Sequence, residues 1–322
     1  MISRYLKNNS ALALVLSLLV MTVLFMITSS YYQDSVLALK RSSNLKNIAI
    51  CRGAARSGLA HGIALLRADE KLSGAGNKWY QFIPGSKNIA KCFPIDKEEN
   101  IVYQMIIEDQ DGKINLNNLL LDDELIQLFR LFGFPINQSQ IFRDSLLDWI
   151  DTNHEHRLNG KEDNYYQGLN PRYHCKNIWL DSLEEIFLIH GLREQDETIF
   201  FGANPYGYDL RRLTTVMVGT ETAININTAC KEVLQIYLQL KPGQIQQIQA
   251  MRNQMQSWQN IADAKNALGL SEEAARRIKT TSQVFRIKSL GRMIGLPYQS
   301  QIEAMICVSH QKQVVFLSYD EK

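Results

Sequence analysis

The chain has 322 residues, of which 45% are hydrophobic and 21% are charged, and its formal net charge is +2. This length suits about two or three domains of ordinary size, and the composition is that of a folded protein. Lys and Arg are spread along the chain, so it lacks the basic patch that is typical of nucleic-acid binders. None of the five cysteines forms a CxxC pair, which argues against zinc-binding and thioredoxin-like motifs.

The N-terminal segment predicts a membrane-spanning helix. No residue from Ser10 to Tyr32 is charged, and an apolar run of about 18 or more residues is long enough to cross a bilayer. Arg4 and Lys7 precede this run, whereas the first acidic residue is Asp34. By the positive-inside rule, the short N-terminal tail stays in the cytoplasm and the remaining chain lies outside.

The main alternative is a cleaved secretory signal. The apolar region of such a signal is usually about 7–15 residues long, and the run in this chain is longer. The helical pattern also continues beyond it, with Leu59, Ile63 and Leu66 at helical spacing and no proline before Pro84. We therefore expect one continuous helix from about Ala11 to Leu72.

Strand signals flank a long helical block. Residues 101–108 are rich in β-branched and aromatic types, and residues 284–290, 298–309 and 313–319 have strand character too. Between them, residues 112–280 have a helical pattern. A strand at 101–108 has no local partner, so we expect it to pair with the C-terminal strands rather than to stand in a separate domain. The predicted fold is α+β, with a long pilin-like helix, a small antiparallel sheet and a large inserted all-α domain.

The helical block contains a weak repeat. Residues 113–118 are Lys-Ile-Asn-Leu-Asn-Asn, and residues 223–228 are Ala-Ile-Asn-Ile-Asn-Thr. Each segment precedes a helical stretch, and we expect an Asn or Thr side chain to cap the next helix. The repeat indicates two related subdomains, at about 112–214 and 215–280. The other predicted parts are a leader-like tail at 1–10, a transmembrane helix at 11–32, a helix extension with the first strands at 33–111, and C-terminal strands at 281–322.

The segment Asp148–Gly191 carries the pattern of a known family. It opens with Asp-Trp-Ile-Asp at 148–151, continues through an acidic loop to Tyr165 and Tyr166, and closes a helix at Gly191. The other matching positions are Pro171, Tyr173, Asn177, Ser182, Glu184 and Glu185. This pattern resembles the K-type minor pseudopilins of type II secretion, the general secretion pathway protein K family. The two Asn-rich segments and the N-terminal helix also resemble family features, so the resemblance covers nearly the whole chain.

The resemblance implies a structural subunit at the tip of the type II secretion pseudopilus that supports export of folded proteins across the outer membrane. It implies I-type and J-type minor pseudopilins as partners, with other secretion components and exoproteins as further contacts. It also implies a single-pass protein of the inner membrane with a periplasmic C-terminal domain.

Two positions depart from the pilin pattern. The leader lacks the glycine that normally precedes the cut, because Asn9, Ser10 and Ala11 stand there. The position of cleavage is therefore open. The region of the fifth mature residue is apolar at Leu14 and Val15, whereas major pilins carry Glu. The K-type family also lacks that acid, and a subunit with nothing above it has no need to offer a buried carboxylate.

The acidic loop predicts a structural Ca²⁺ ion. Oxygen ligands at alternating positions, closed by a bidentate Glu, suit calcium, and the resemblance implies calcium here. His156 stands where an EF-hand needs glycine, which argues against a true EF-hand. A solvated acidic loop and a zinc site with His154 and His156 are the alternatives. The predicted ligands are Asp151, Asn153, Glu155, the carbonyl of Arg157, Glu162 and Asp163, with Asn159 at the ninth position of the template.

No catalytic motif is present: the chain has no GxSxG, HExxH or P-loop sequence. We therefore predict no catalytic or cofactor-binding residues and no enzymatic activity. The alternative function is a membrane-anchored DNA-uptake protein, since Ile224–Arg252 resembles a helix-hairpin-helix. Its turn at Leu240–Gln244 lacks the second glycine of a phosphate-binding turn, so we expect a packing hairpin and no nucleic-acid binding.

Overall fold

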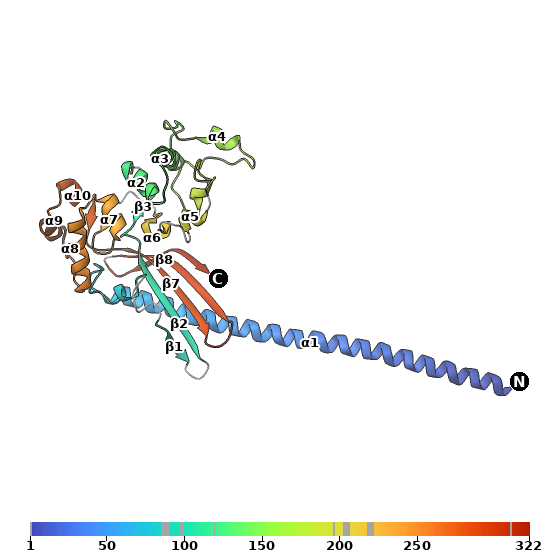
Figure 1. Ribbon diagram of the computed structural model, residues 1–322. Helices are drawn as coiled ribbons and strands as arrows, with labels where there is room; N and C mark the ends of the chain where they lie inside the picture. The colour runs from blue at the N-terminus through green and yellow to red at the C-terminus, as the bar shows by residue number, and fades with distance from the viewer. Residues whose placement is uncertain are drawn as a thin grey trace.

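A computed structural model describes residues 2–84, 91–96, 100–118, 120–195, 197–201, 207–217, 222–309 and 311–322, with side chains from residue 12 onward. Its most prominent element is helix α1 (Ile2–Ala68), which projects far beyond the rest of the molecule (Figure 1). The predicted continuous helix is confirmed. The side chains of Arg4 and Lys7 lie outside the described residues.

A five-stranded antiparallel sheet with the order β1-β2-β7-β8-β9 lies on the C-terminal half of α1. Strand β2 pairs with β7 along its whole length, with Ile101 opposite Met293 and Asp109 opposite Phe285. The sheet is thus built from both sides of the inserted block, as the sequence predicts. The strands are β1 (Phe93–Asp96), β2 (Ile101–Asp109), β7 (Val284–Met293), β8 (Gln299–Val308) and β9 (Val314–Glu321).

Small residues allow α1 to approach the sheet closely. A Cβ added at Gly58 would overlap the Ser289 hydroxyl, and one at Gly62 would lie 3.1 Å from the Ile287 side chain. These glycines therefore serve packing within the chain. The core between helix and sheet contains Leu59, Leu66, Trp79, Met105, Ile107, Phe285, Ile302 and Ile306.

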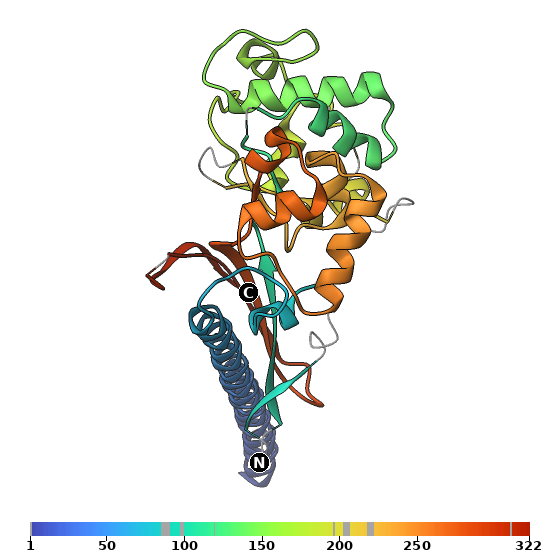
Figure 2. The ribbon, with the colours of Figure 1, turned by 90° about the vertical axis from the view of Figure 1, so that its left-hand side faces the viewer.

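The inserted block has a separate core, which includes Phe129, Phe142, Trp149, Tyr166, Phe200 and Leu234. It stands beyond the end of the sheet, at the opposite end of the molecule from the N-terminus (Figures 1 and 2). Its helices are α2 (Asp123–Leu131), α3 (Ile136–Ile150), α4 (Asp163–Gln167), α5 (Glu197–Phe201), α6 (Leu210–Leu213), α7 (Lys231–Tyr237), α8 (Pro242–Asn253), α9 (Ile261–Leu268) and α10 (Glu272–Arg276). Among the described residues, 3₁₀ helices lie at η1 (Trp79–Phe82), before the sheet, and at η3 (Leu183–Leu188), in the block.

The block also contains two short parallel ribbons, so the expectation of an all-α insert is incomplete. Strand β3 (Ile114–Asn115) pairs with β4 (Thr214–Thr215), and β5 (Ile224–Asn225) pairs with β6 (Ile278–Lys279). Each ribbon joins the start of one predicted subdomain to its end. The ribbons were not predicted because each strand has only two residues and pairs with a distant segment.

The repeated Asn residues do not cap helices, and this expectation was wrong. The side chain of Asn117 instead clamps a distant backbone: its Nδ2 donates to the carbonyl of Leu180 at 3.0 Å, and its Oδ1 accepts from the Leu180 N–H at 2.7 Å. Helix α2 begins after Asp122, which makes no side-chain capping bond. Asn117 therefore holds the first subdomain together over 63 residues.

The second subdomain repeats the same device. Asn227 donates to the carbonyl of Trp258 at 3.0 Å and accepts from the Trp258 N–H at 2.9 Å. It also donates to the carbonyl of Thr280 at 3.0 Å. Helix α7 follows Cys230, whose side chain makes no capping bond. The two Asn residues have equivalent roles, which supports a common architecture of the two halves.

Candidate functional site

The first candidate site is the projecting part of α1. All side chains from Leu12 to Thr28 are exposed, including Phe25 at 74%. The segment is long and apolar enough to cross a membrane. An apolar surface of this size needs another apolar environment to cover it, such as a lipid bilayer or the helices of other subunits.

The polar residues of this segment are satisfied within the helix. The hydroxyls of Ser17 and Thr22 donate to the carbonyls of Leu14 and Leu19, both at 2.8 Å, and Thr28 donates to Leu24 at 2.9 Å. In a bilayer every polar group must find a partner inside the protein, because no water is available. The side-chain bonding of α1 therefore suits insertion into lipid.

Helix α1 is also tied to the globular part by charge. Arg52 and Arg56 both pair with Glu321 at the end of β9, at 2.7 Å and 3.2 Å. Tyr298 donates a hydrogen bond to Asn44 at 2.6 Å. These contacts lie outside the apolar segment, so the globular part contacts only the C-terminal half of the helix.

The second candidate site is the acidic loop after α3. Asp148 and Asp151 both accept from Nη1 of Arg157 at 2.6 Å. The carboxylate of Glu162 is buried near them, and within the described residues neither of its oxygens has a hydrogen-bond partner. Burial and the negative charges of Asp148 and Asp151 raise the pKa of Glu162. The ionised form of a buried carboxylate that has no hydrogen-bond donor and lies close to two others is unfavourable unless a positive charge is nearby.

Gly160 contributes to this arrangement. A Cβ at this position would overlap Oδ2 of Asp148, so only glycine lets the loop fold against that carboxylate. Burial raises the pKa of Asp148 even though Arg157 lies beside it. Asp148 belongs to the family pattern, but the sequence does not predict it as a site residue because it lies on α3 and not in the loop.

The other predicted ligands have different contacts. Asn153 accepts from the N–H of Glu155 at 2.7 Å, and the Glu155 side chain is exposed. Asp163 accepts from the N–H of Cys175 at 2.8 Å, and Asn159 donates to Asp144 at 2.9 Å. The structure thus brings the carboxylates of Asp151 and Glu162 near each other, and Asn153 contacts Asp151 through its backbone N–H at 3.1 Å. Arg157 reaches Asp151 with its guanidinium, whereas its carbonyl, the predicted ligand, accepts from the N–H of Gly160 at 3.1 Å. Among the described residues, no three His, Cys, Asp or Glu side chains form a ready metal cluster.

The third candidate site, the hairpin between α7 and α8, is closed by Gln244. The N–H of Lys241 donates to Oε1 of Gln244 at 2.8 Å, and Nε2 of Gln244 donates to the carbonyl of Leu268 at 2.7 Å. Ile245 and Ile248 are buried. The N–H of Lys241 is therefore bonded within the hairpin, and Gln244 ties the hairpin to the end of α9.

Comparison with known proteins gives a consistent result. The family model described as Type II secretion system (T2SS), protein K matches residues 112–197. The type II secretion system protein K of Pseudomonas aeruginosa is 25% identical over 320 residues, which cover 96% of this chain and 88% of that protein. The resemblance to the protein K family is confirmed.

The fold agrees with the sequence match. A chain in the crystal structure of the GspK-GspI-GspJ complex from the enterotoxigenic Escherichia coli type 2 secretion system superposes with a TM-score of 0.65. The two chains are 17% identical, and the match covers 90% of this chain and 99% of that one. The protein K match at 112–197 includes the acidic loop and most of the first subdomain. The DNA-uptake alternative is not supported, since both sequence matches are to protein K and the structural match is to a chain of the GspK-GspI-GspJ complex.

Proposed function

We propose that this chain is the K-type minor pseudopilin of a type II secretion system, and that it is a structural subunit without enzymatic activity. The proposal rests on the exposure of α1. Its N-terminal apolar half projects into the surroundings, whereas the globular part packs only against its C-terminal half. Such a helix can wait in a membrane and then pack among the helices of a filament. Its similarity over 96% of the chain to a protein K supports the same role.

The proposed partners are the I-type and J-type minor pseudopilins. The E. coli chain with the same fold forms a complex with GspI and GspJ. We expect this chain to present α1 to the corresponding helices of its own partners. Other secretion components and exoproteins are further candidates for contact with the inserted block.

The proposed location is the inner membrane, with a single pass, a cytoplasmic N-terminus and a periplasmic globular part. Arg4 and Lys7 precede the apolar run and no acidic residue occurs before Asp34, which supports this orientation.

The proposed position in the pseudopilus is the tip. The inserted block lies at the end of the molecule opposite the N-terminus (Figures 1 and 2). When α1 packs into the filament, the block stands above it and occupies the space that the next subunit would need. One copy would therefore end the filament.

The acidic loop is the proposed site of a structural Ca²⁺ ion. The unpartnered oxygens of Glu162 near Asp148 and Asp151 fit a cation with oxygen ligands. Asp151 and Glu162 would hold the ion, with Asn153, Glu155, the carbonyl of Arg157 and Asp163 as the remaining proposed ligands. Calcium would neutralise clustered carboxylates, while Arg157 keeps Asp148 and Asp151 oriented.

The decisive experiment is purification of the tagged full chain from detergent-solubilised envelope membranes. We expect I-type and J-type pseudopilins to co-purify, and we expect the chain to restore secretion in a strain that lacks its own protein K. Leu16→Lys introduces a charge into the bare helix and should abolish both results, whereas Leu120→Lys, at a side chain that is 78% exposed, should not. Recovery of the chain as a free periplasmic protein without α1 would contradict the proposal.

A further inference from the structure

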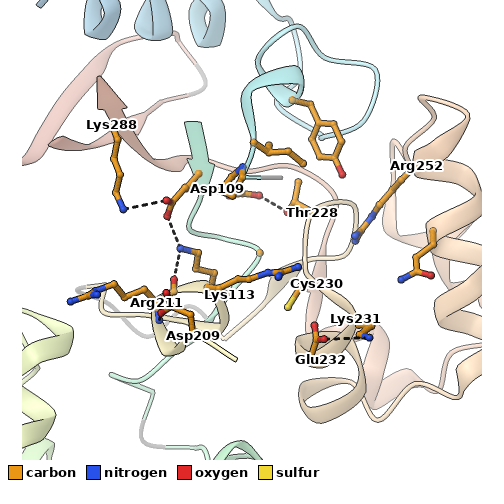
Figure 3. A pocket seen from close by; sticks show the side chains of 17 residues that line it. Asp109, Lys113, Asp209, Arg211, Thr228, Cys230, Lys231, Glu232, Arg252 and Lys288 are labelled. Carbon is orange, nitrogen blue, oxygen red and sulfur yellow. Dashed lines mark hydrogen bonds and ion pairs between the residues drawn. The ribbon is translucent and has the colours of Figure 1, made fainter. Parts of the chain in front are cut away.

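A cavity of about 580 Å³ lies where the sheet meets the inserted block. It is bounded by the end of β2, the middle of β7, η1, and α6, α7 and α8 (Figure 3). The volume falls within the range of roughly 300–1,000 Å³ that is usual for small-molecule sites. Its lining is rich in cations, namely Lys113, Arg211, Arg212, Lys231, Arg252 and Lys288.

Most of these cations already have an acidic partner. Glu108 lies between Lys113, at 3.1 Å, and Lys288, at 3.4 Å. Lys231 is 3.6 Å from Glu232, and the Arg211 guanidinium pairs with Glu184. In the part of the chain that the structure describes, no carboxylate lies within 4.0 Å of Arg212 or Arg252. The cavity therefore carries a local excess of positive charge.

Arg252 is a cation whose lost hydration is incompletely compensated by the chain. It extends inward from α8 (Figure 3), and its Nη2 donates to the carbonyl of Ile226 at 2.7 Å. Its Nε is buried and has no acceptor among the described residues. Burial lowers the pKa of Arg252, which reflects the cost of desolvating its charge. A buried charge is stable only when an opposite charge or good hydrogen bonds compensate for the lost water.

Asp109 supplies this compensation only in part, because its negative charge acts to raise the pKa of Arg252 while burial lowers it by more. Asp109 also lines the cavity, but it accepts hydrogen bonds from Thr228, Ser282 and the N–H of Asp111. Its carboxylate is thus held by hydroxyl and amide groups of the chain. The guanidinium of Arg252 remains available to a group from outside.

We propose that this cavity is a binding site for an oxyanion, a carboxylate or a phosphate, with Arg252 as its main ligand and the exposed Arg212 as its second. A guanidinium presents paired N–H groups that match the two oxygens of such an anion. Tyr80, Ile83 and Pro84 form a less polar wall, so the anion can carry an apolar part. A small free anion or an acidic side chain of another polypeptide can supply this chemistry. The site is independent of the proposed role of α1.

The test is isothermal titration of the full chain in detergent with two probes. One is inorganic phosphate, and the other is a short acetylated peptide with one Asp among apolar residues, compared with the same peptide carrying Asn. We expect at least one probe to bind, and Arg252→Gln to weaken it about tenfold to hundredfold, as the loss of a hydrogen bond to a charged group does. Binding of phosphate points to a small anion, and binding of the Asp peptide alone points to a polypeptide.

Two further variants separate recognition from folding. Arg212→Gln removes an exposed side chain, so it should weaken binding without changing the melting temperature. Arg276→Gln removes the same charge from an exposed position on α10 and should leave binding unchanged. The proposal is overturned if neither probe binds the wild-type chain, or if Arg252→Gln and Arg276→Gln have the same effect on binding.

Discussion

Asp109 is a buried carboxylic acid at the end of β2, where the sheet meets the insert. Burial and the nearby charge of Asp111 raise its pKa from 3.8 to about 6. The folded chain therefore binds this proton more tightly than the unfolded chain does. It follows that Asp109 adds stability as the pH falls from about 6 to about 4 and loses this contribution as the pH rises, by up to about 3 kcal/mol.

The variant Asp109→Asn should remove this dependence, because Asn does not titrate. We expect the free energy of unfolding of the wild-type chain, relative to that of the variant, to fall between pH 4 and pH 7. Chemical denaturation in detergent at pH 4, 5.5 and 7 measures it. Asp123→Asn, at an exposed position, is the control and should run parallel to the wild type. A parallel course for Asp109→Asn as well would show that Asp109 does not titrate differently in the folded chain.

Glu162 tests the calcium proposal at the same scale. A bound ion stabilises the folded chain by about 2.7 kcal/mol when its concentration is a hundredfold above Kd. We expect calcium to raise the melting temperature of the wild-type chain and a chelator to lower it. Glu162→Gln should abolish the difference, whereas Glu273→Gln, at an exposed site on α10, should preserve it. An equal melting temperature with calcium and with chelator in the wild type would rule out a structural ion.

The two Asn clamps are the features that organise the insert at the scale of its elements. Replacement of Asn227 by Ala leaves the N–H of Trp258 and two buried carbonyls without partners. We expect Asn227→Ala and Asn117→Ala each to lower the free energy of unfolding by about 3 kcal/mol. Asn253→Ala, at the exposed end of α8, should change it by less than about 0.5 kcal/mol. Denaturant titration of the full chain measures all three. Values for Asn117 and Asn227 as small as that for Asn253 would contradict the clamp interpretation.

The strands follow from local sequence patterns, whereas the Asn clamps depend on contacts between distant residues. This difference determines which features the sequence can predict. The long helix and β2, β7, β8 and β9 follow from runs of apolar or β-branched residues, whose pattern is local. The local sequence around Asn117 and Asn227 favours helix caps. In the folded chain, however, their side chains bond to residues 63 and 31 positions away. The same limit applies to the sites. The spacing of Asp151 and Glu162 predicts their meeting, while Asp148 and the cavity of Arg252 depend on tertiary packing alone.

The whole molecule consists of two units with separate cores, and this division allows the tip proposal to be tested. The insert leaves the sheet after β2 and returns at β7, where the N–H of Gln110 bonds to the carbonyl of Val284 at 3.0 Å. Because these ends are adjacent, a short hairpin turn can replace residues 111–283. The core between α1 and the sheet contains no residue of the deleted block, so the shortened chain should keep its sheet and its membrane helix.

We expect this shortened chain to lose the proposed capping effect, since nothing would then stand above α1 to exclude the next subunit. The number of copies per purified pseudopilus should rise well above one, measured by quantitative mass spectrometry against the major subunit. Circular dichroism of the shortened chain checks that the sheet persists. If the sheet is intact and the copy number still does not rise, the proposal that steric exclusion by the insert ends the filament is wrong.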